Sequence, residues 1–391
     1  MRTATVLLGM NPPFSTSFSR AAGVGLTSQY GSPLCVRWLS RFVTPSQDVK
    51  HNRPNGDRIG GEGDYRSSGT LETSVPVTGM SRVGRKSMQY QSPFEDWPTH
   101  STVHKPLPDF TCETGLVLFP PELVPGISHP LVSKLGDHAG RLLAMRKLES
   151  YNAFTESLEY KAVMAAAIKI AQNPGAFGLS EQAGREARLI VTDESHHAYV
   201  AVELIKRLPG FSELPPLTSQ PPFLRGLEEL ERRLPTEFAD DLLIAFVSMS
   251  ETLITSILRG IPRDPRVVSA VRNAVRDHFI DEARHHAYFV YVVHQHWASS
   301  IPARREILGP LYARLIRLFL DPDRDLCRTW LMEAGLDPHD ASVVLQDYYS
   351  PERVAVSRRA DAFPTLKLME RVGILDHPTA RSAFVEQKLI S

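Results

Sequence analysis

Two stretches of the sequence decide the fold: Asp193-Glu194-Ser195-His196-His197 and Asp281-Glu282-Ala283-Arg284-His285-His286. Each places a glutamate three residues before a histidine, as Glu194-x-x-His197 and Glu282-x-x-His285. Because residues three apart lie on one face of an α-helix, a single helix can offer a carboxylate and an imidazole to the same metal ion. One such pair arises readily by chance, but two pairs inside two long apolar helices indicate a metal site.

The surrounding sequence predicts four long helices, at 142–172, 181–208, 237–259 and 265–297. Asn173-Pro174-Gly175 ends the first, Pro209-Gly210 ends the second, and Ser180 is a suitable N-cap between them. A long proline-rich link with a short helix near 224–234 joins the second helix to the third. Two helical hairpins joined by one long crossover are typical of a ferritin-like four-helix bundle, so we expect an all-α fold. Additional C-terminal helices are expected over 303–375, with interruptions at Pro322, Pro338, Pro351 and Pro364.

The two remaining bundle helices each supply one further carboxylate. Glu159 lies on the first helix and Glu251 on the third, both among apolar neighbours. A carboxylate buried in such a setting is costly unless a partner or a metal neutralises it. His278 adds a seventh donor, because at about 100° per residue it falls on the same stripe of the fourth helix as Glu282 and His285. This carboxylate-rich set suits iron or manganese better than zinc.

Other residues near these positions have supporting roles in this hypothesis. Asp193 and Asp281 each precede a candidate ligand by one residue and a candidate histidine by four, so we expect them to orient imidazole N–H groups. Residues within two turns of a ligand are candidates for the substrate pocket: Tyr151, Asn152, Thr155, Ser248 and Thr255.

The composition excludes several other classes of protein. Lysine plus arginine equals aspartate plus glutamate at 44 each among 391 residues, so no charge excess favours nucleic acid. The three cysteines are far apart, which argues against a disulfide framework and for a reducing, cytoplasmic location. No apolar run approaches the roughly 20 residues of a membrane span.

Residues 1–90 differ in composition from the rest of the chain. They are rich in Ser, Gly, Pro and Arg and lack helical periodicity, so we expect a disordered extension ahead of one domain at 91–391. No acidic residue precedes Asp48, which is compatible with organellar targeting, although a dispensable tail is the preferred interpretation.

The full ligand pattern resembles the dinuclear iron N-oxygenases of antibiotic biosynthesis, over roughly residues 105–375. Six of the ligands are shared with ribonucleotide reductase small subunits, acyl-carrier desaturases and bacterial monooxygenases, whereas His278 is similar to the extra histidine of the N-oxygenases. The resemblance implies two iron ions, O2 as co-substrate, and an arylamine oxidised to hydroxylamine, nitroso or nitro compounds. It implies that Glu159 and Glu251 bind or bridge the irons.

The sequence also bears on the redox partner and on alternative functions. No glycine-rich flavin or nicotinamide fingerprint is present, so an external donor such as a ferredoxin with its reductase is expected. The sequence leaves open whether the protein is a homodimer. The alternatives are a di-iron carbon hydroxylase or desaturase and a non-catalytic iron-binding protein of the ferritin type.

Overall fold

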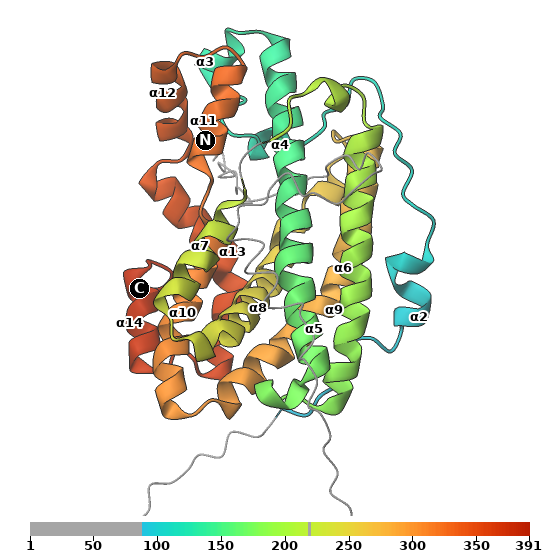
Figure 1. Ribbon diagram of the computed structural model, residues 1–391. Coiled ribbons are helices and arrows are strands. Elements are labelled where there is room, and N and C mark those ends of the chain that lie inside the picture. The colour runs from blue at the N-terminus through green and yellow to red at the C-terminus, as the bar shows by residue number, and fades with distance from the viewer. Residues whose placement is uncertain (1–87, 218–219) are drawn as a thin grey trace, which may run out of the picture.

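The computed structural model describes residues 88–217 and 220–391, and within 255–257 only the backbone. The expected extension at 1–90 therefore lies almost entirely outside the described residues. Within them the regular structure is helical, and the β structure is limited to one isolated parallel bridge between Val117 and Val267. The predicted all-α class is confirmed (Figure 1).

Four long antiparallel segments form the central bundle. The first is α4, Asp137–Leu158, continued by the π-helical turn η3, Glu159–Val163, and by α5, Met164–Gln172. The others are α6, Glu181–Arg207; α8, Ala239–Leu258; and α9, Ser269–Ser299. α5 packs on α6 and α8 packs on α9, and α6 meets α9 across the middle. The expected N-cap is present, since the Ser180 hydroxyl accepts a hydrogen bond from the amide of Ala183.

The remaining helices lie around this bundle. The long crossover carries α7, Pro222–Arg233, with its apolar side against the bundle. The C-terminal helices are α10, Pro302–Leu320; α11, Arg324–Glu333; α12, Pro338–Tyr348; α13, Pro351–Val372; and α14, Pro378–Glu386. α10 and α13 pack on α8, and together these helices cover one side of the bundle (Figure 1). None of the described helices combines the length and the apolar character that crossing a membrane requires.

A segment ahead of the bundle covers the outer side of α6 (Figure 1). It contains α2, Trp97–His100, and the 3-10 turn η1, Thr102–His104, which contacts both α6 and α9. The turn η2, Pro121–Leu123, and the short helix α3, Pro130–Ser133, lead from it into α4. Further 3-10 turns are η4, Pro174–Phe177; η5, Phe211–Glu213; η6, Thr236–Phe238; and η7, Ile261–Arg263.

Three predicted helix limits differ from the structure, the first being the start of α4, which begins at Asp137 and not at 142. α9 begins at Ser269 and not at 265, because the backbone of Arg266 and Val268 is extended and hydrogen-bonded to Val117. Pro364 does not interrupt a helix but lies inside α13. A proline in that position sacrifices one backbone hydrogen bond, and packing of α13 on α8 and α10 favours a continuous helix in spite of that loss.

Candidate metal centre

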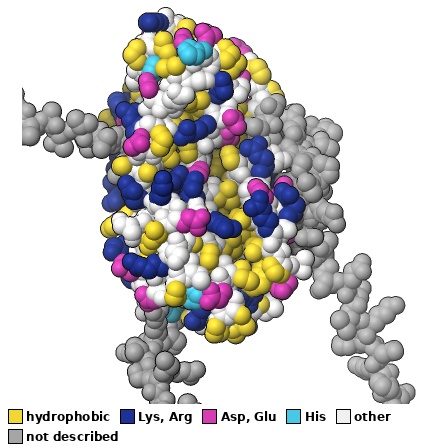
Figure 2. Space-filling model, turned by 90° about the vertical axis from the view of Figure 1, so that its left-hand side faces the viewer, with side chains coloured by type: hydrophobic (Ala, Val, Ile, Leu, Met, Phe, Trp, Pro, Cys, Tyr) yellow, Lys and Arg dark blue, Asp and Glu magenta, His cyan; other side chains and the backbone are white. Residues whose placement is uncertain are grey.

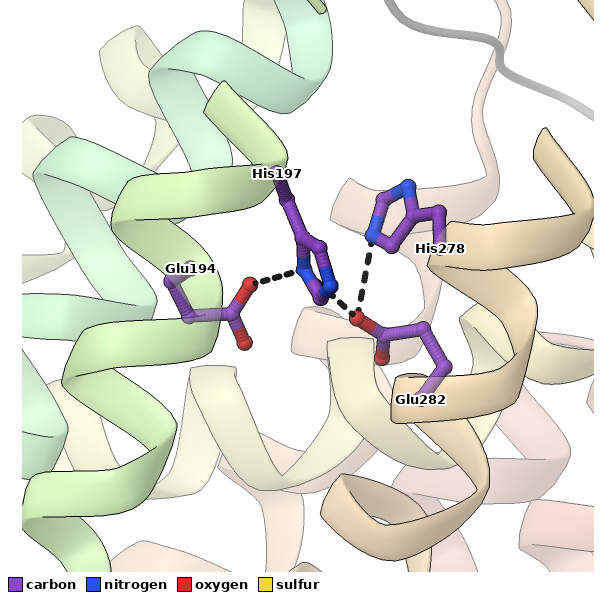
Figure 3. Close-up of side chains that lie close together, drawn as sticks. All are labelled: Glu194, His197, His278 and Glu282. Atoms are coloured by element: carbon purple, nitrogen blue, oxygen red, sulfur yellow. Dashed lines mark hydrogen bonds and ion pairs between the residues drawn. The ribbon is translucent and has the colours of Figure 1, made fainter. Parts of the chain in front are cut away.

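Seven side chains meet in the core of the bundle, and the sequence predicted all seven. They come from the π-turn, α6, α8 and α9 and are all buried: Glu159, Glu194, His197, Glu251, His278, Glu282 and His285. Figure 3 shows four of them, with Glu194 and His197 on one helix turned toward His278 and Glu282 on the other. All seven side chains are buried among apolar residues, so bulk water compensates little of their charge.

The first set of donors consists of Glu194, His197, His278 and Glu282. One ligand atom from each lies within 4.8 Å of the others. Nδ1 of His197 is 2.9 Å from a Glu194 oxygen, and Nε2 of His278 is 3.0 Å from a Glu282 oxygen. Glu159 approaches the same set, with an oxygen 3.7 Å from Nε2 of His278. These donors can therefore surround one metal ion.

The second set consists of Glu194, Glu251, Glu282 and His285, again within 4.8 Å of one another. Nδ1 of His285 is 2.9 Å from Glu194, 3.5 Å from Glu282 and 3.9 Å from Glu251. Glu194 and Glu282 belong to both sets. The geometry thus suits two metal ions that share these two carboxylates, with Glu251 at one end and Glu159 at the other.

The histidines of the two motifs are held by aspartates on the opposite helix. Nε2 of His197 is 3.0 Å from Asp281 of α9, and Nε2 of His285 is 3.1 Å from Asp193 of α6. In the sequence each aspartate precedes a histidine of its own helix by four residues. In the structure each aspartate instead contacts the motif histidine of the other helix. When an aspartate accepts a hydrogen bond from Nε2–H, the proton stays on Nε2, and the lone pair of Nδ1 points at the metal position.

The segment ahead of the bundle holds these aspartates in turn, which sequence reasoning missed. The indole Nε1 of Trp97 donates to both oxygens of Asp193 at 2.9 and 3.0 Å, and the Ser101 hydroxyl donates to the same carboxylate at 2.6 Å. On the other side, the backbone amide and hydroxyl of Thr102 donate to Asp281, which also pairs with Arg284. We call Trp97, Ser101 and Thr102 the clasp.

Electrostatics divide the four carboxylates into two pairs. Burial, together with the neighbouring carboxylates, raises the pKa of Glu159 and of Glu251 well above its usual range. Burial also opposes ionisation of Glu194 and Glu282, but the charge of His285 lowers the pKa of both. Only the latter pair is therefore readily ionised without a metal, and it is this pair that belongs to both donor sets.

The donor set fits a pair of divalent cations. Neither oxygen of Glu159 or of Glu251 accepts a hydrogen bond from any described donor, although all four atoms are buried. Such atoms are costly unless something coordinates them. Two divalent ions would balance the charge of four carboxylates, and oxygen-rich donor sets with imidazoles favour iron or manganese.

A cavity opens beside the first donor set, and we call it the metal-side cavity. It encloses about 500 Å³ of empty space, part of it open to solvent, between α4, α6, α9 and the segment at 102–108. Its lining includes both His197 and His278, and three of the predicted pocket residues, Tyr151, Asn152 and Thr155.

The other two predicted pocket residues have different outcomes. Ser248 is buried in α8 and is not among the described residues that line the metal-side cavity. The side chain of Thr255 lies outside the described residues.

A ferritin-like bundle whose core gathers four carboxylates and three imidazoles has the architecture of the di-iron proteins. The particular family follows from a comparison with family models: P-aminobenzoate N-oxygenase AurF matches residues 88–373. The chain belongs to this family. The match begins earlier than the expected residue 105, so it includes the clasp. A comparison with curated proteins found no match.

Proposed function

We propose that the protein is a di-iron oxygenase that uses O2 to oxidise the nitrogen of an arylamine. The observation that carries the proposal is that the metal-side cavity reaches His197 and His278 of the donor set. An amine that enters there comes next to the metal centre, whereas the enclosed core excludes bulk water from the other sides.

Each donor has a defined task in this proposal. The seven donors would hold two irons: Glu194 and Glu282 belong to both donor sets, Glu159, His197 and His278 would serve one iron, and Glu251 and His285 would serve the other. The irons, when bound, supply the activation of O2. Asp281 and Asp193 keep the protons on Nε2 of His197 and His285, so that both rings present Nδ1 to the metal.

The apolar part of the cavity suits an aromatic ring, and Val200, Ala201, Leu204 and Val275 contribute to it. Asn152 and Thr155 are buried polar side chains on the α4 side of the cavity, each with an atom that has no described hydrogen-bond partner. They are suited to form hydrogen bonds with a polar substituent of the substrate, because a buried donor or acceptor without a hydrogen-bond partner costs free energy.

The first oxidation, from amine to hydroxylamine, consumes O2, two electrons and two protons and releases one water. We therefore infer an external one-electron donor, such as a ferredoxin with its reductase. Further oxidation to nitroso and nitro compounds, a role in antibiotic biosynthesis, a cytoplasmic location and a homodimer remain predictions.

The experiment is to load the purified chain with iron, reduce it, and expose it to O2 with p-aminobenzoate and other arylamines. We expect about two irons per chain and N-oxidised products by mass spectrometry. His278→Ala should lower both the affinity for one iron and turnover by roughly 10–100-fold. His138→Ala, an exposed histidine of α4, is the matched control and should change neither.

The same experiment separates the rival functions. Oxidation at carbon without any N-oxidised product would favour a hydroxylase or desaturase. Uptake of many irons per chain without turnover would favour storage. Either result would refute the proposed reaction.

A further inference from the structure

A second cavity lies where α4 meets the C-terminal helices, and we call it the C-terminal cavity. It encloses about 450 Å³ of empty space, part of it open to solvent, and it has no lining residue in common with the metal-side cavity. Its lining comes from α4, the end of α10, the end of α12 and the first turns of α13. Lys147, its α4 residue, precedes Glu159 by twelve positions, which is about 18 Å along a helix axis.

The charges around this cavity have one sign. Lys147, Arg353 and Arg358 line it, and no acidic side chain is among its described lining residues. The metal-side cavity, by contrast, has one lysine and one aspartate, Lys105 and Asp277. Figure 2 shows the face of the molecule on the side of the C-terminal helices, where Lys and Arg side chains gather across the middle. The C-terminal cavity therefore favours an anion.

Two nearby carboxylates contact the lining of this cavity: Asp321 compensates part of the charge of Arg358, and Asp361 accepts a hydrogen bond from Ser357. Asp321 pairs with Arg317 and with Arg358, although the Nε atom of Arg358 is buried without a described hydrogen-bond partner. Asp323 caps α11 by accepting from the amide of Leu326. Arg353 donates to the backbone carbonyl of Asp347 and has no carboxylate partner among the described ion pairs.

Lys147 is the least compensated of the three cations. It is 7% exposed, and the described residues provide its ammonium group with no hydrogen bond and no ion pair. Its one described partner is the ring of Phe119, whose centroid is 5.7 Å from Nζ. Burial lowers the pKa of Lys147 to about 8. A largely buried lysine whose ammonium group has no described anionic partner destabilises a fold, so a function for it is the simplest account of its presence.

We propose that the C-terminal cavity binds a small organic anion, with a carboxylate or phosphate group held by Lys147, Arg353 and Arg358. Leu123, Leu320, Pro322 and Val354 form the apolar part of the wall, and Tyr348 and Tyr349 add aromatic surface. A volume of this size suits a ligand with a single ring or a short chain. The site is separate from the metal centre, so it is an additional binding site and does not depend on the proposed reaction.

The test is isothermal titration calorimetry on the iron-loaded full chain with benzoate, benzamide and inorganic phosphate. Benzamide has the shape of benzoate without its charge. We expect benzoate or phosphate to bind, and benzamide to bind at least tenfold more weakly than benzoate. Lys147→Met, which keeps the apolar stem, should weaken binding of the anion at least tenfold. Lys134→Met, at an exposed lysine that lines neither cavity, is the matched control and should leave it unchanged, whereas Lys105→Met would weaken binding only if the anion occupied the metal-side cavity.

Thermal unfolding gives a second readout. Without a ligand, Lys147→Met should raise Tm because it removes an unpaired buried charge, and the anion should raise Tm of the wild type but not of the variant. Arg353→Gln changes an exposed side chain and should weaken anion binding without loss of the fold.

Several results would overturn the proposal: no binding of either anion, equal binding of benzamide and benzoate, or a loss of affinity in Lys105→Met but not in Lys147→Met. A lower Tm for ligand-free Lys147→Met would likewise count against it, since Lys147 would then stabilise the fold by itself. Binding of phosphate alone would assign the site to phosphate compounds, and binding of benzoate alone would assign it to carboxylates.

Discussion

Trp97→Phe tests whether the clasp supports the metal centre. The substitution removes the Nε1–H donor that lies 2.9 and 3.0 Å from the two oxygens of Asp193, which in turn holds His285. A hydrogen bond to a charged acceptor contributes about 1.5–3 kcal/mol. Loss of a group that orients a metal ligand typically lowers metal affinity by about 10–100-fold. We therefore expect both a less stable protein and weaker iron binding.

Trp330→Phe is the matched control. Trp330 is a buried tryptophan of α11, but its Nε1 has no described hydrogen-bond partner. Both substitutions lose similar ring volume, and only Trp97→Phe loses a hydrogen bond. Urea unfolding measures the change in stability, and competition with a coloured chelator measures the affinity for Fe2+.

The expected result is a large loss of iron affinity in Trp97→Phe and little change in Trp330→Phe. If both variants bind iron as tightly as the wild type, the clasp has no influence on the centre and the reasoning is refuted. If Trp97→Phe is less stable but binds iron normally, the hydrogen bond to Asp193 stabilises the fold without orienting His285.

Two further predictions concern stability away from the metal. Burial raises the pKa of Asp361, which accepts a hydrogen bond from Ser357, to about 6, so the folded state binds more protons than the unfolded state between about pH 4 and 6. Asp361→Asn should therefore be more stable than the wild type above pH 6, by at most about 3 kcal/mol, and the difference should vanish below about pH 4 in urea titrations; an equal difference at both pH values would contradict this. Gly309→Ala in α10 should destabilise by about 1–3 kcal/mol, because its new Cβ would lie 2.7 Å from Cβ of Ala380 in α14. Gly140→Ala in α4, whose nearest contact is 3.8 Å away, is the control and should be neutral or more stable in thermal unfolding.

The sequence predicted the bundle and the side chains that meet in its core because both signals are local. Helix ends such as Ser180 and Pro209-Gly210 depend on neighbouring residues, and the two Glu-x-x-His pairs lie within single helical turns. Glu159 and Glu251 were identifiable because an ionised group in an apolar helix requires compensation.

The clasp and the crossed aspartates were not predictable in this way. Trp97 is 96 residues from Asp193, and Thr102 is 179 residues from Asp281, so no local pattern records either contact. The sequence also left open whether Glu159 and Glu251 bind one metal or bridge two, because helical periodicity gives no distances between helices; in the structure Glu194 and Glu282 belong to both donor sets. The start of α9 was missed because its extended approach depends on pairing with Val117, far back in the chain.

The π-turn at Glu159–Val163 has a consequence for how such a protein diversifies. A π-turn holds one residue more than an α-helical turn, and deletion of that residue would rotate α4 by about 100° relative to α5. Tyr151, Asn152 and Thr155 would swing away from the metal-side cavity, while the motifs on α6 and α9 would keep their places. Glu159 is the first residue of this turn, so a single inserted or deleted codon here would move one donor of the centre together with the side of the cavity that meets the substrate.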